Sequence, residues 1–223
     1  MKISFIFPSR SRSVKFFAAL NNIRDMCDSQ DYEIICALDE DDPTMNNQEV
    51  KDELAKYNNV TYYYGLSANK IAACNREVTR ISQDTSIICL HSDDMKFLEK
   101  GFDNEIREAF KIHFPNLDGV VHFPDQNAKA RTMTYTMMGV NLYNKLGYLY
   151  WPGYISIYAD NDLTDMTKMM GKYVFVNKKI LNHFHPIWNL SSWDAQYRKT
   201  ESKELYKIDR ETFMKRTANN FGL

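Results

Sequence analysis

Ile87-Ile-Cys-Leu-His-Ser-Asp-Asp-Met95 joins an apolar run to a pair of acids near the middle of the chain. Its apolar first half ends at Leu90, and two adjacent carboxylates, Asp93 and Asp94, follow shortly afterwards. A short apolar run of this kind is typical of a strand buried on both faces of a parallel sheet. Open α/β sheets bind their ligands just beyond the carboxyl ends of such strands. The pattern therefore indicates a ligand site at Asp93 and Asp94, with a helix cap near Met95 as the alternative.

Three further strand-like runs precede this stretch, and a segment with helical spacing separates each from the next. Val14, Phe17 and Leu20 show that spacing in the first of these segments. The alternation predicts βαβ units and a parallel sheet, whose right-handed crossovers bring the polar loops after the strands to one edge. The expected strands cover residues 2–7, 32–38, 60–64 and 87–90, and the expected helices cover residues 14–26, 49–57 and 69–81.

The second half of the chain is less regular. Residues 132–140 fit either a strand or a core helix, and Gly171 is well placed to close a helix. No repeat or linker interrupts the chain, so a single domain over residues 1–223 is expected. The other expected elements are helices over residues 103–110, 141–147 and 163–170 and strands over residues 119–123, 173–176 and 180–185.

The composition is that of an ordinary globular protein of 223 residues, with 44% hydrophobic and 26% charged residues. Its 28 basic and 29 acidic residues give a net charge of -1, which favours neither a nucleic-acid nor a membrane-surface partner. The cysteines form no CxxC pair, so buried free thiols in a reducing compartment are expected. The first apolar segment is too short for a signal peptide, and no run reaches the roughly 18 apolar residues of a membrane span. A cytoplasmic location is therefore predicted.

Several motifs that bind phosphate or carry a nucleophile are absent from the sequence. There is no GxxxxGK[ST] loop, no GxGxxG after the first strand and no GxSxG elbow. An α/β protein that binds a nucleotide without a glycine-rich loop needs another way to neutralise phosphate. A divalent cation held by carboxylates is the usual alternative, which again points to Asp93 and Asp94.

A pair of histidines near the end of the chain is the second candidate source of metal ligands. Residues two apart in an extended segment face the same side, so His183 and His185 are both expected to point at one site. Histidine beside carboxylates would suit Mn²⁺. Ordinary packing beside Phe184 and Trp188 is the alternative for both histidines.

Other polar residues also allow two interpretations each. Asp160 and Asp162 precede a helix, so each is either a cap or a general base. Arg10 and Arg12 follow the first strand and either contact phosphate or belong to a solvated loop. Asp39 follows the second strand, where it could accept hydrogen bonds from a base or ribose.

In their order and spacing, these segments resemble a family 2-type glycosyltransferase of the GT-A fold, over most of the chain. The segments that carry the resemblance are Phe5-Ile-Phe-Pro-Ser-Arg10, Tyr32-Glu-Ile-Ile-Cys-Ala-Leu-Asp39, Ala72-Ala-Cys-Asn75, Leu90-His-Ser-Asp-Asp94, Gly147-Tyr-Leu-Tyr-Trp-Pro-Gly-Tyr154, Asp160-Asn-Asp-Leu163 and His183-Phe-His-Pro186. Asn69-Lys-Ile71 and Asp194-Ala-Gln-Tyr197 are similar to a small bacterial and viral branch of this group. No QxxRW ending is present, which argues against the processive synthases, and the first acid of the DxD motif falls on His91 or Ser92.

The resemblance implies an α/β GT-A domain with a Rossmann-like, mostly parallel central sheet flanked by helices. Residues 1–98 would bind the nucleotide sugar, and residues 99–223 would bind the acceptor and supply the catalytic base. The implied reaction is metal-dependent transfer of a hexosyl or pentosyl group from a UDP- or GDP-sugar to a hydroxyl of a glycan or another acceptor, with inversion.

The resemblance also implies a role for individual residues. Asp160, or Asp162 as the second choice, would be the general base. Mn²⁺ or Mg²⁺ would bind Asp93, Asp94 and one of the two histidines, His183 or His185. The residues expected to contact the donor are Pro8, Arg10, Arg12, Asp39, Asn69, Lys70, Asn75 and Asp93.

Three other functions remain open on the sequence. A nucleotidyltransferase would normally open with a glycine-rich loop, which Pro8-Ser-Arg-Ser-Arg12 is not. A binding module that keeps the fold without catalysis would bind a nucleotide sugar or glycan and turn nothing over. A phage-encoded enzyme in the host cytoplasm would glycosylate DNA bases, with nucleic acid only as the acceptor, and would bind duplex DNA in a salt-sensitive manner.

Overall fold

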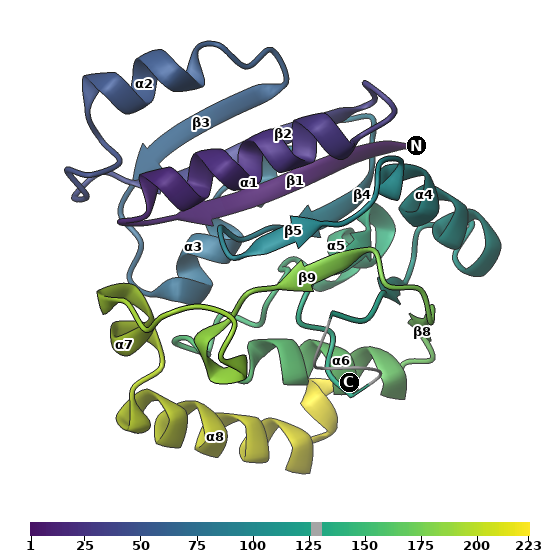
Figure 1. The fold of residues 1–223 in the computed structure, drawn as a ribbon. Coiled ribbons are helices and arrows are strands. Elements are labelled where there is room, and N and C mark those ends of the chain that lie inside the picture. Colours follow the sequence, from purple (N-terminus) through teal and green to yellow (C-terminus); the bar gives the residue numbers. More distant parts are fainter. Residues whose placement is uncertain (126–130) are drawn as a thin grey trace.

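A computed structural model describes residues 1–125 and 131–223. Its centre is a seven-stranded sheet in the order β3-β2-β1-β4-β7-β6-β8 (Figure 1). The first four strands are parallel, as predicted, and lie within a residue or two of the expected ranges. They are β1 (Lys2–Ser9), β2 (Tyr32–Asp39), β3 (Val60–Gly65) and β4 (Thr85–Leu90).

Helices join these strands as the alternation predicts. α1 covers Ser13–Met26 and α2 covers Gln48–Leu54. The third expected helix is shorter than predicted, because α3 (Lys70–Arg76) ends and a 3₁₀ turn, η1 (Val78–Arg80), follows. The side chain of Arg76, the last residue of α3, reaches the backbone carbonyls of Leu38 and Gly65 at the ends of β2 and β3.

The second half extends the sheet with one antiparallel step. β7 (Met137–Gly139) pairs antiparallel with both β4 and β6 (Val120–His122), while β8 (Tyr173–Phe175) is parallel to β6. The ambiguous segment 132–140 therefore ends in a strand. Gly139 closes that strand next to Leu117, whose carbonyl oxygen would lie 2.2 Å from an added Cβ, so no larger residue fits there.

The three predicted helices of the second half are present, and one of them begins earlier than expected. α4 covers Phe102–His113, and α5 covers Val140–Leu146 and ends at Gly147 in the left-handed region. α6 (Ala159–Met169) begins four residues earlier than predicted, and Tyr158 occupies its N-cap position. Asp160 and Asp162 consequently lie inside the first helical turn, so the prediction that either caps this helix is wrong.

A second, two-stranded sheet forms beside the carboxyl end of β4. β5 (Met95–Phe97) pairs antiparallel with β9 (Leu181–His183), with Met95 opposite His183. No helix begins near Met95, which excludes the helix-cap interpretation of Asp93 and Asp94. The two carboxylates instead lie in the turn that joins β4 to β5.

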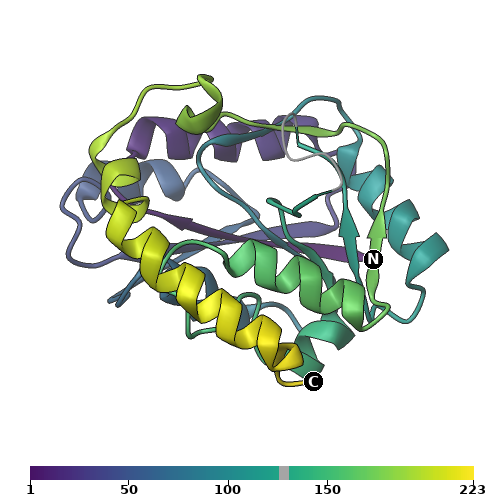
Figure 2. The same cartoon turned by 90° about the horizontal axis from the view of Figure 1, so that it is seen from below.

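The last part of the chain contains helices that the sequence pattern did not predict. After the 3₁₀ turn η2 (Pro186–Trp188) come α7 (Ala195–Thr200), α8 (Lys203–Ala218) and the turn η3 (Asn220–Gly222). α8 lies along α6 and is mostly exposed, so it lacks the apolar stripe that marks a buried helix (Figures 1 and 2). Asp209 is its one fully buried residue.

The core is divided between the two faces of the central sheet. Phe5 and Phe7 of β1 pack with α1, α2 and α4 on one face. Ile6 and Ile88 pack with α3, α5 and α6 on the other face. The cysteines are free and buried, as predicted. Within the described residues, no helix is long and apolar enough to cross a membrane.

Candidate active site

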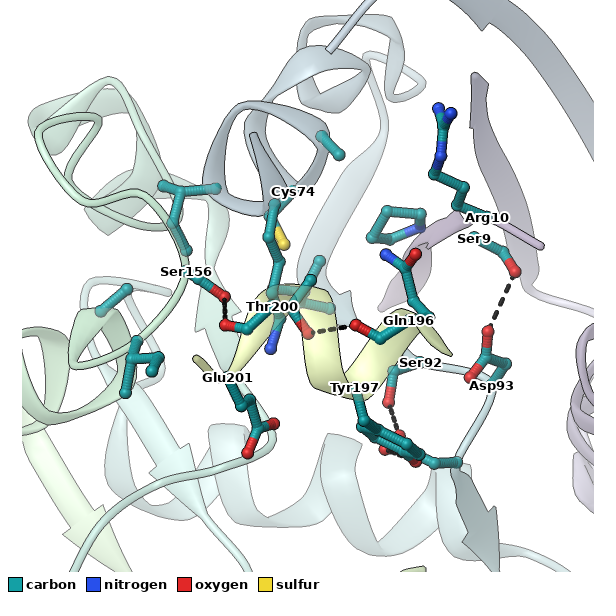
Figure 3. A pocket seen from close by; sticks show the side chains of 18 of the residues that line it. Ser9, Arg10, Cys74, Ser92, Asp93, Ser156, Gln196, Tyr197, Thr200 and Glu201 are labelled. Carbon is teal, nitrogen blue, oxygen red and sulfur yellow. Dashed lines mark hydrogen bonds between the residues drawn. The ribbon is translucent and has the colours of Figure 1, made fainter. Parts of the chain in front are cut away.

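A cavity of about 430 Å³ opens at the carboxyl ends of β1, β2 and β4, and α7 contributes to its wall (Figure 3). Parallel strands converge there, as the sequence predicts for a ligand site. Most of the candidate residues line it. Those that do are Pro8, Arg10, Arg12, Asp39, Asn69, Lys70, Asp93, Asp94, Asp160, His183 and His185.

Two candidate residues lie outside the cavity lining. The Asn75 amide nitrogen donates to the Tyr150 carbonyl at 2.7 Å, and its oxygen accepts from the backbone of Leu149 and Tyr150. Asn75 therefore holds the 149–150 backbone and is not part of the cavity lining, so its predicted contact with the donor has no support in the geometry. Asp162 is 1% exposed and accepts two hydrogen bonds from Arg216 at 2.6 and 3.1 Å. It is an internal ion-pair partner outside the cavity lining, so the geometry favours Asp160 as the proposed base.

Asp39 ends β2 at the cavity wall between two arginines. Its two oxygens accept from Arg10 at 3.0 Å and from Arg76 at 3.1 Å. Arg10 also forms two hydrogen bonds to Asp41, and this pairing raises the pKa of its guanidinium. Sequence reasoning missed Arg76, because nothing in a helical segment marks a residue that turns back to strand ends.

Arg12 joins the end of β1 to the C-terminal segment. It donates to Asp93 at 2.9 Å and forms a two-point contact with Asp194 at 2.9 and 2.8 Å. Its guanidinium also lies 3.8 Å from the centre of the Tyr197 ring. The Arg12 side chain is only 10% exposed, so the solvated-loop alternative is wrong for this residue. Its guanidinium already pairs with two carboxylates, so it is not free to bind phosphate.

The two carboxylates after β4 have different surroundings. Asp93 accepts from Arg12 and, at 3.0 Å, from the Ser9 hydroxyl (Figure 3). Burial raises the pKa of Asp93, although Arg12 opposes that effect. Asp94 accepts from the Tyr197 hydroxyl at 2.8 Å and from the Ser92 hydroxyl. Burial alone would raise the pKa of Asp94 too, but contact with His183 holds it well below the usual range.

The two late histidines lie next to each other but face different partners. Their ring centres are 5.3 Å apart, in keeping with residues two apart on an extended segment. His183 Nε2 lies 3.2 Å from Asp94 Oδ2, whereas His185 Nε2 lies 2.6 Å from Glu201 Oε1. Both imidazoles line the same cavity, as expected, although they contact different acids. Burial lowers the pKa of His183, but Asp125 and Asp94 outweigh this effect and raise the pKa to about 9.

Only a small set of side chains at the site could bind a divalent cation. Among the described residues, no group of three His, Cys, Asp or Glu side chains is arranged to hold a metal ion. Mg²⁺ sites on phosphate substrates, however, often use only one or two protein carboxylates, with the phosphates completing the shell. Asp94 and His183, facing each other across 3.2 Å at the cavity wall, fit that smaller requirement.

His91 occupies a position where the family resemblance expects an acid. It is 1% exposed, stacks on Phe97 with ring centres 5.6 Å apart, and contacts the Tyr135 hydroxyl at 3.1 Å. Burial lowers the pKa of His91 to about 3, so the ring is neutral. It packs among aromatic rings and supplies no charge to the site.

Asp160 faces the cavity from the first turn of α6. Its carboxylate accepts a hydrogen bond from the Asn161 backbone at 2.9 Å, and it forms no ion pair with any lysine or arginine in the described part of the chain. Burial raises the pKa of Asp160, with smaller opposing effects that include Lys70 and His183. A carboxylate with a raised pKa and no cationic partner is a suitable proton acceptor.

Two lysines differ from the arginines at this cavity. Lys70 and Lys199 both line it, and neither forms an ion pair with another described residue. Lys199 comes from α7 and was missed, because no sequence pattern predicted that helix. Asn69, the neighbour of Lys70, caps α3 by accepting from the Ala72 backbone at 2.8 Å. The lysines therefore supply the uncommitted positive charge at the site.

Another residue missed on the sequence orders the segment before Asp160. Asp209 of α8 accepts hydrogen bonds from three consecutive backbone N–H groups, Ile155, Ser156 and Ile157, at 2.9, 2.8 and 2.7 Å. Ser156 also donates to the Thr200 carbonyl at 2.6 Å, which ties this segment to the end of α7 (Figure 3). A single acid in an exposed helix carries no sequence signal of such a role.

Comparison with known proteins identifies the class of fold. No protein-family model and no curated protein matches the sequence. Solved structures do match. The Staphylococcus aureus protein TarS 1-349 in complex with UDP-GlcNAc has a TM-score of 0.68 at 13% identity, over 94% of this chain. The mannosyltransferase PcManGT from Pyrobaculum calidifontis, in complex with GDP-Man and Mn²⁺, has a TM-score of 0.64 at 12% identity, over 80% of this chain.

These neighbours are GT-A-type glycosyltransferases, and the chain has their α/β fold. It covers 65% of the TarS chain and 55% of the mannosyltransferase chain, which is less than two thirds of either. The 4-diphosphocytidyl-2C-methyl-D-erythritol synthase from Anaerococcus prevotii matches with a TM-score of 0.56 at 13% identity, over 95% of this chain and 96% of that one. At such identities the likeness shows the fold alone.

Proposed function

We propose that this protein is a glycosyltransferase that transfers a sugar from a nucleoside diphosphate sugar to an acceptor hydroxyl. The observation that carries the proposal is the cavity itself, which Asp39 lines at the end of β2. Lys70, Lys199 and Asp160 line the same cavity, and none of them forms an ion pair with another described residue. The fold shared with two nucleotide-sugar enzymes supports it. Residues 1–98 would supply most donor contacts, and residues 99–223 the acceptor side and the base.

The donor side follows from charge and hydrogen-bonding capacity. Asp39 only accepts hydrogen bonds, so it suits an N–H group of a base or a hydroxyl of the ribose. A UDP- or GDP-sugar is the proposed donor, because two similar structures are complexes with UDP-GlcNAc and GDP-Man. Lys70 and Lys199 would contact the diphosphate, because each is a cation at the cavity without an ion pair to another described residue. Arg10 and Arg12 would act indirectly, by holding Asp39 and Asp93 in place.

The acceptor side centres on Asp160. Its carboxylate would remove the proton from the acceptor hydroxyl as that oxygen attacks the anomeric carbon. The bond between the anomeric carbon and the diphosphate breaks in the same step, so the configuration inverts. The raised pKa of Asp160 makes it a stronger base than an exposed aspartate, and Asp209 holds the backbone that leads to it.

Asp94 and His183 are the residues that would hold Mn²⁺ or Mg²⁺. A cation bound there would supply charge neutralisation at the leaving diphosphate. Asp93 would support this site through its hydrogen bonds with Arg12 and Ser9.

The proposal is tested with a panel of UDP- and GDP-sugars, with and without Mn²⁺. A true donor at one hundred times its Kd adds about 2.7 kcal/mol to stability, which is a rise of roughly 5–10 °C in melting temperature for a chain of this size. The stabilising donor is then incubated with glycan, small-hydroxyl and duplex DNA acceptors, and transfer is followed by mass spectrometry.

The alternatives give different results in the same experiment. Donor binding without transfer to any acceptor or to water would identify a binding module. The structural similarity to 4-diphosphocytidyl-2C-methyl-D-erythritol synthase extends over nearly the whole of both chains. It supports a second candidate function, that of a nucleotidyltransferase. Pyrophosphate release from CTP and a sugar or polyol phosphate, with no response to sugar nucleotides, would favour that function instead.

A further inference from the structure

His183 stands between two carboxylates. Its Nε2 lies 3.2 Å from Asp94 Oδ2, and its Nδ1 lies 3.4 Å from Asp125 Oδ2. Nδ1 is buried and forms no well-aligned hydrogen bond to a described residue, so Asp125 Oδ2 is an acceptor within a small adjustment of it.

The backbone fixes this arrangement from two sides. β5 and β9 place Met95 opposite His183, and the Phe184 N–H donates to the Asp94 carbonyl at 2.7 Å. Asp94 and His183 therefore stay side by side. Asp125 follows β6, and its side chain is 0% exposed. The Thr134 hydroxyl donates to Asp125 Oδ2 at 2.9 Å and helps to orient it.

The cavity distinguishes the two carboxylates. Asp94 and His183 line it, whereas Asp125 does not. The imidazole thus separates the cavity from a fully buried acid. A metal-binding histidine characteristically has this environment, in which one ring nitrogen faces the ion and the other donates its N–H to a carboxylate.

We propose that Asp125 is a positioning residue that keeps the proton of His183 on Nδ1, so that Nε2 is presented to a divalent cation shared with Asp94. This inference rests on the metal use in the proposed function, and it extends that function to a residue outside the cavity. A plain ion pair between Asp125 and His183 is the competing explanation. It would contribute to folding without any effect on metal affinity.

The test measures metal binding and therefore needs no acceptor. Mn²⁺ binding in the presence of UDP is followed by electron paramagnetic resonance in the wild type, Asp125→Asn and Asp118→Asn. Loss of such a carboxylate partner typically weakens metal affinity by about 10–100-fold, so D125N should show that loss. Asp118→Asn is the matched control, because Asp118 precedes the same strand and pairs with Lys172 away from the cavity. It should bind Mn²⁺ as the wild type does.

A second variant and an NMR measurement on the wild type test the inference even if D125N misfolds. Thr134→Val removes the hydroxyl that orients Asp125 and should weaken Mn²⁺ binding less than D125N does. In the wild-type protein with UDP and Mg²⁺, proton–nitrogen NMR should show His183 protonated on Nδ1, with His183→Gln used to assign the signal. An Nε2-protonated ring would overturn the inference without reference to any variant.

The outcomes separate the two proposals. Wild-type affinity in D125N, with intact folding, overturns the role of Asp125 and leaves the proposed function standing. No Mn²⁺ binding by the wild-type protein overturns the metal use in the proposed function, and this inference with it. Reduced stability of D125N without reduced affinity supports the plain ion pair and rejects the positioning role.

Discussion

The acids on the two sides of the cavity differ in whether an arginine neutralises them. On the side formed by the strand ends, Asp39 and Asp93 each accept hydrogen bonds from an arginine. On the side formed by α6, Asp160 has no cationic partner among the described residues, and burial raises its pKa. The same residue type thus serves as a neutralised structural group on one side and as a potential base on the other.

The contrast is repeated within a single turn of α6. Asp160 faces the cavity, whereas Asp162, two residues later, is buried against Arg216 and the Tyr154 hydroxyl. Residues two apart on a helix point in different directions, so neighbours in sequence enter different environments. Pairing with a cation is what separates the acids that hold the site together from the acid available for chemistry.

The largest expected effect is on catalysis. Asp160→Asn removes the proton acceptor and should lower the rate of sugar transfer by about 10²–10⁴-fold, the usual contribution of general-base catalysis. Nucleotide release is measured with the acceptor found in the donor screen, and donor binding is measured by calorimetry. Asp165→Asn, an exposed change on the same helix, should leave both unchanged. Wild-type transfer by D160N would disprove the assignment of the base.

The second largest effect is a loss of stability when the Arg12–Asp93 ion pair at the strand ends is broken. Arg12→Met leaves Asp93, whose side chain is 6% exposed, without its cation. Breaking a buried pair at one partner typically costs about 3 kcal/mol or more. Arg24→Met is the matched control, because the Arg24–Asp25 pair is exposed and such pairs contribute less than about 1 kcal/mol. Urea unfolding measures both, and equal losses in the two variants would show that Arg12 is not a structural cation.

Substitutions of the two acids in the first turn of α6 should change the unfolding free energy by an intermediate amount and in opposite directions. Asp162→Asn weakens two charge-assisted hydrogen bonds from Arg216 and should cost about 2 kcal/mol of unfolding free energy. Asp160→Asn should instead stabilise the protein at neutral pH, because a carboxylate with a raised pKa is less favourable when ionised in the folded state. That gain should disappear as the pH falls through the raised pKa. Destabilisation by both variants would contradict the contrast.

The smallest effect is a shift in pH dependence. Transfer requires ionised Asp160, so the rate should fall about tenfold per pH unit below its pKa and level off above it. Because burial raises that pKa, the midpoint should lie above the roughly 3.9 of a free aspartate. A rate profile between pH 4 and 8, restricted to conditions in which circular dichroism shows a folded protein, locates the midpoint. A rate that stays level down to pH 4 would exclude Asp160 as the titrating base.

Much of the site could be predicted from the sequence, because the polar residues that follow short apolar strands meet at one edge of a parallel sheet. Asp39, Asp93 and Asp94 lie at that edge both in the sequence pattern and in the structure. A role that depends on partners distant in the chain leaves no such pattern. Asn75 binds the 149–150 backbone and Asp162 binds Arg216, and nothing local to either residue indicates this.

Hydrophobic period and chain alternation are local properties, so the sequence alone predicted the alternating elements of the first half, the parallel strands and the edge where the cavity opens. Which charged side chains at the cavity have no ion-pair partner depends on long-range contacts. Asp194 reaches Arg12, Asp125 reaches His183 and Asp209 reaches the segment before Asp160. Each of these contacts joins residues far apart in sequence. The energy of a charged group depends on what surrounds it, and folding alone sets those surroundings.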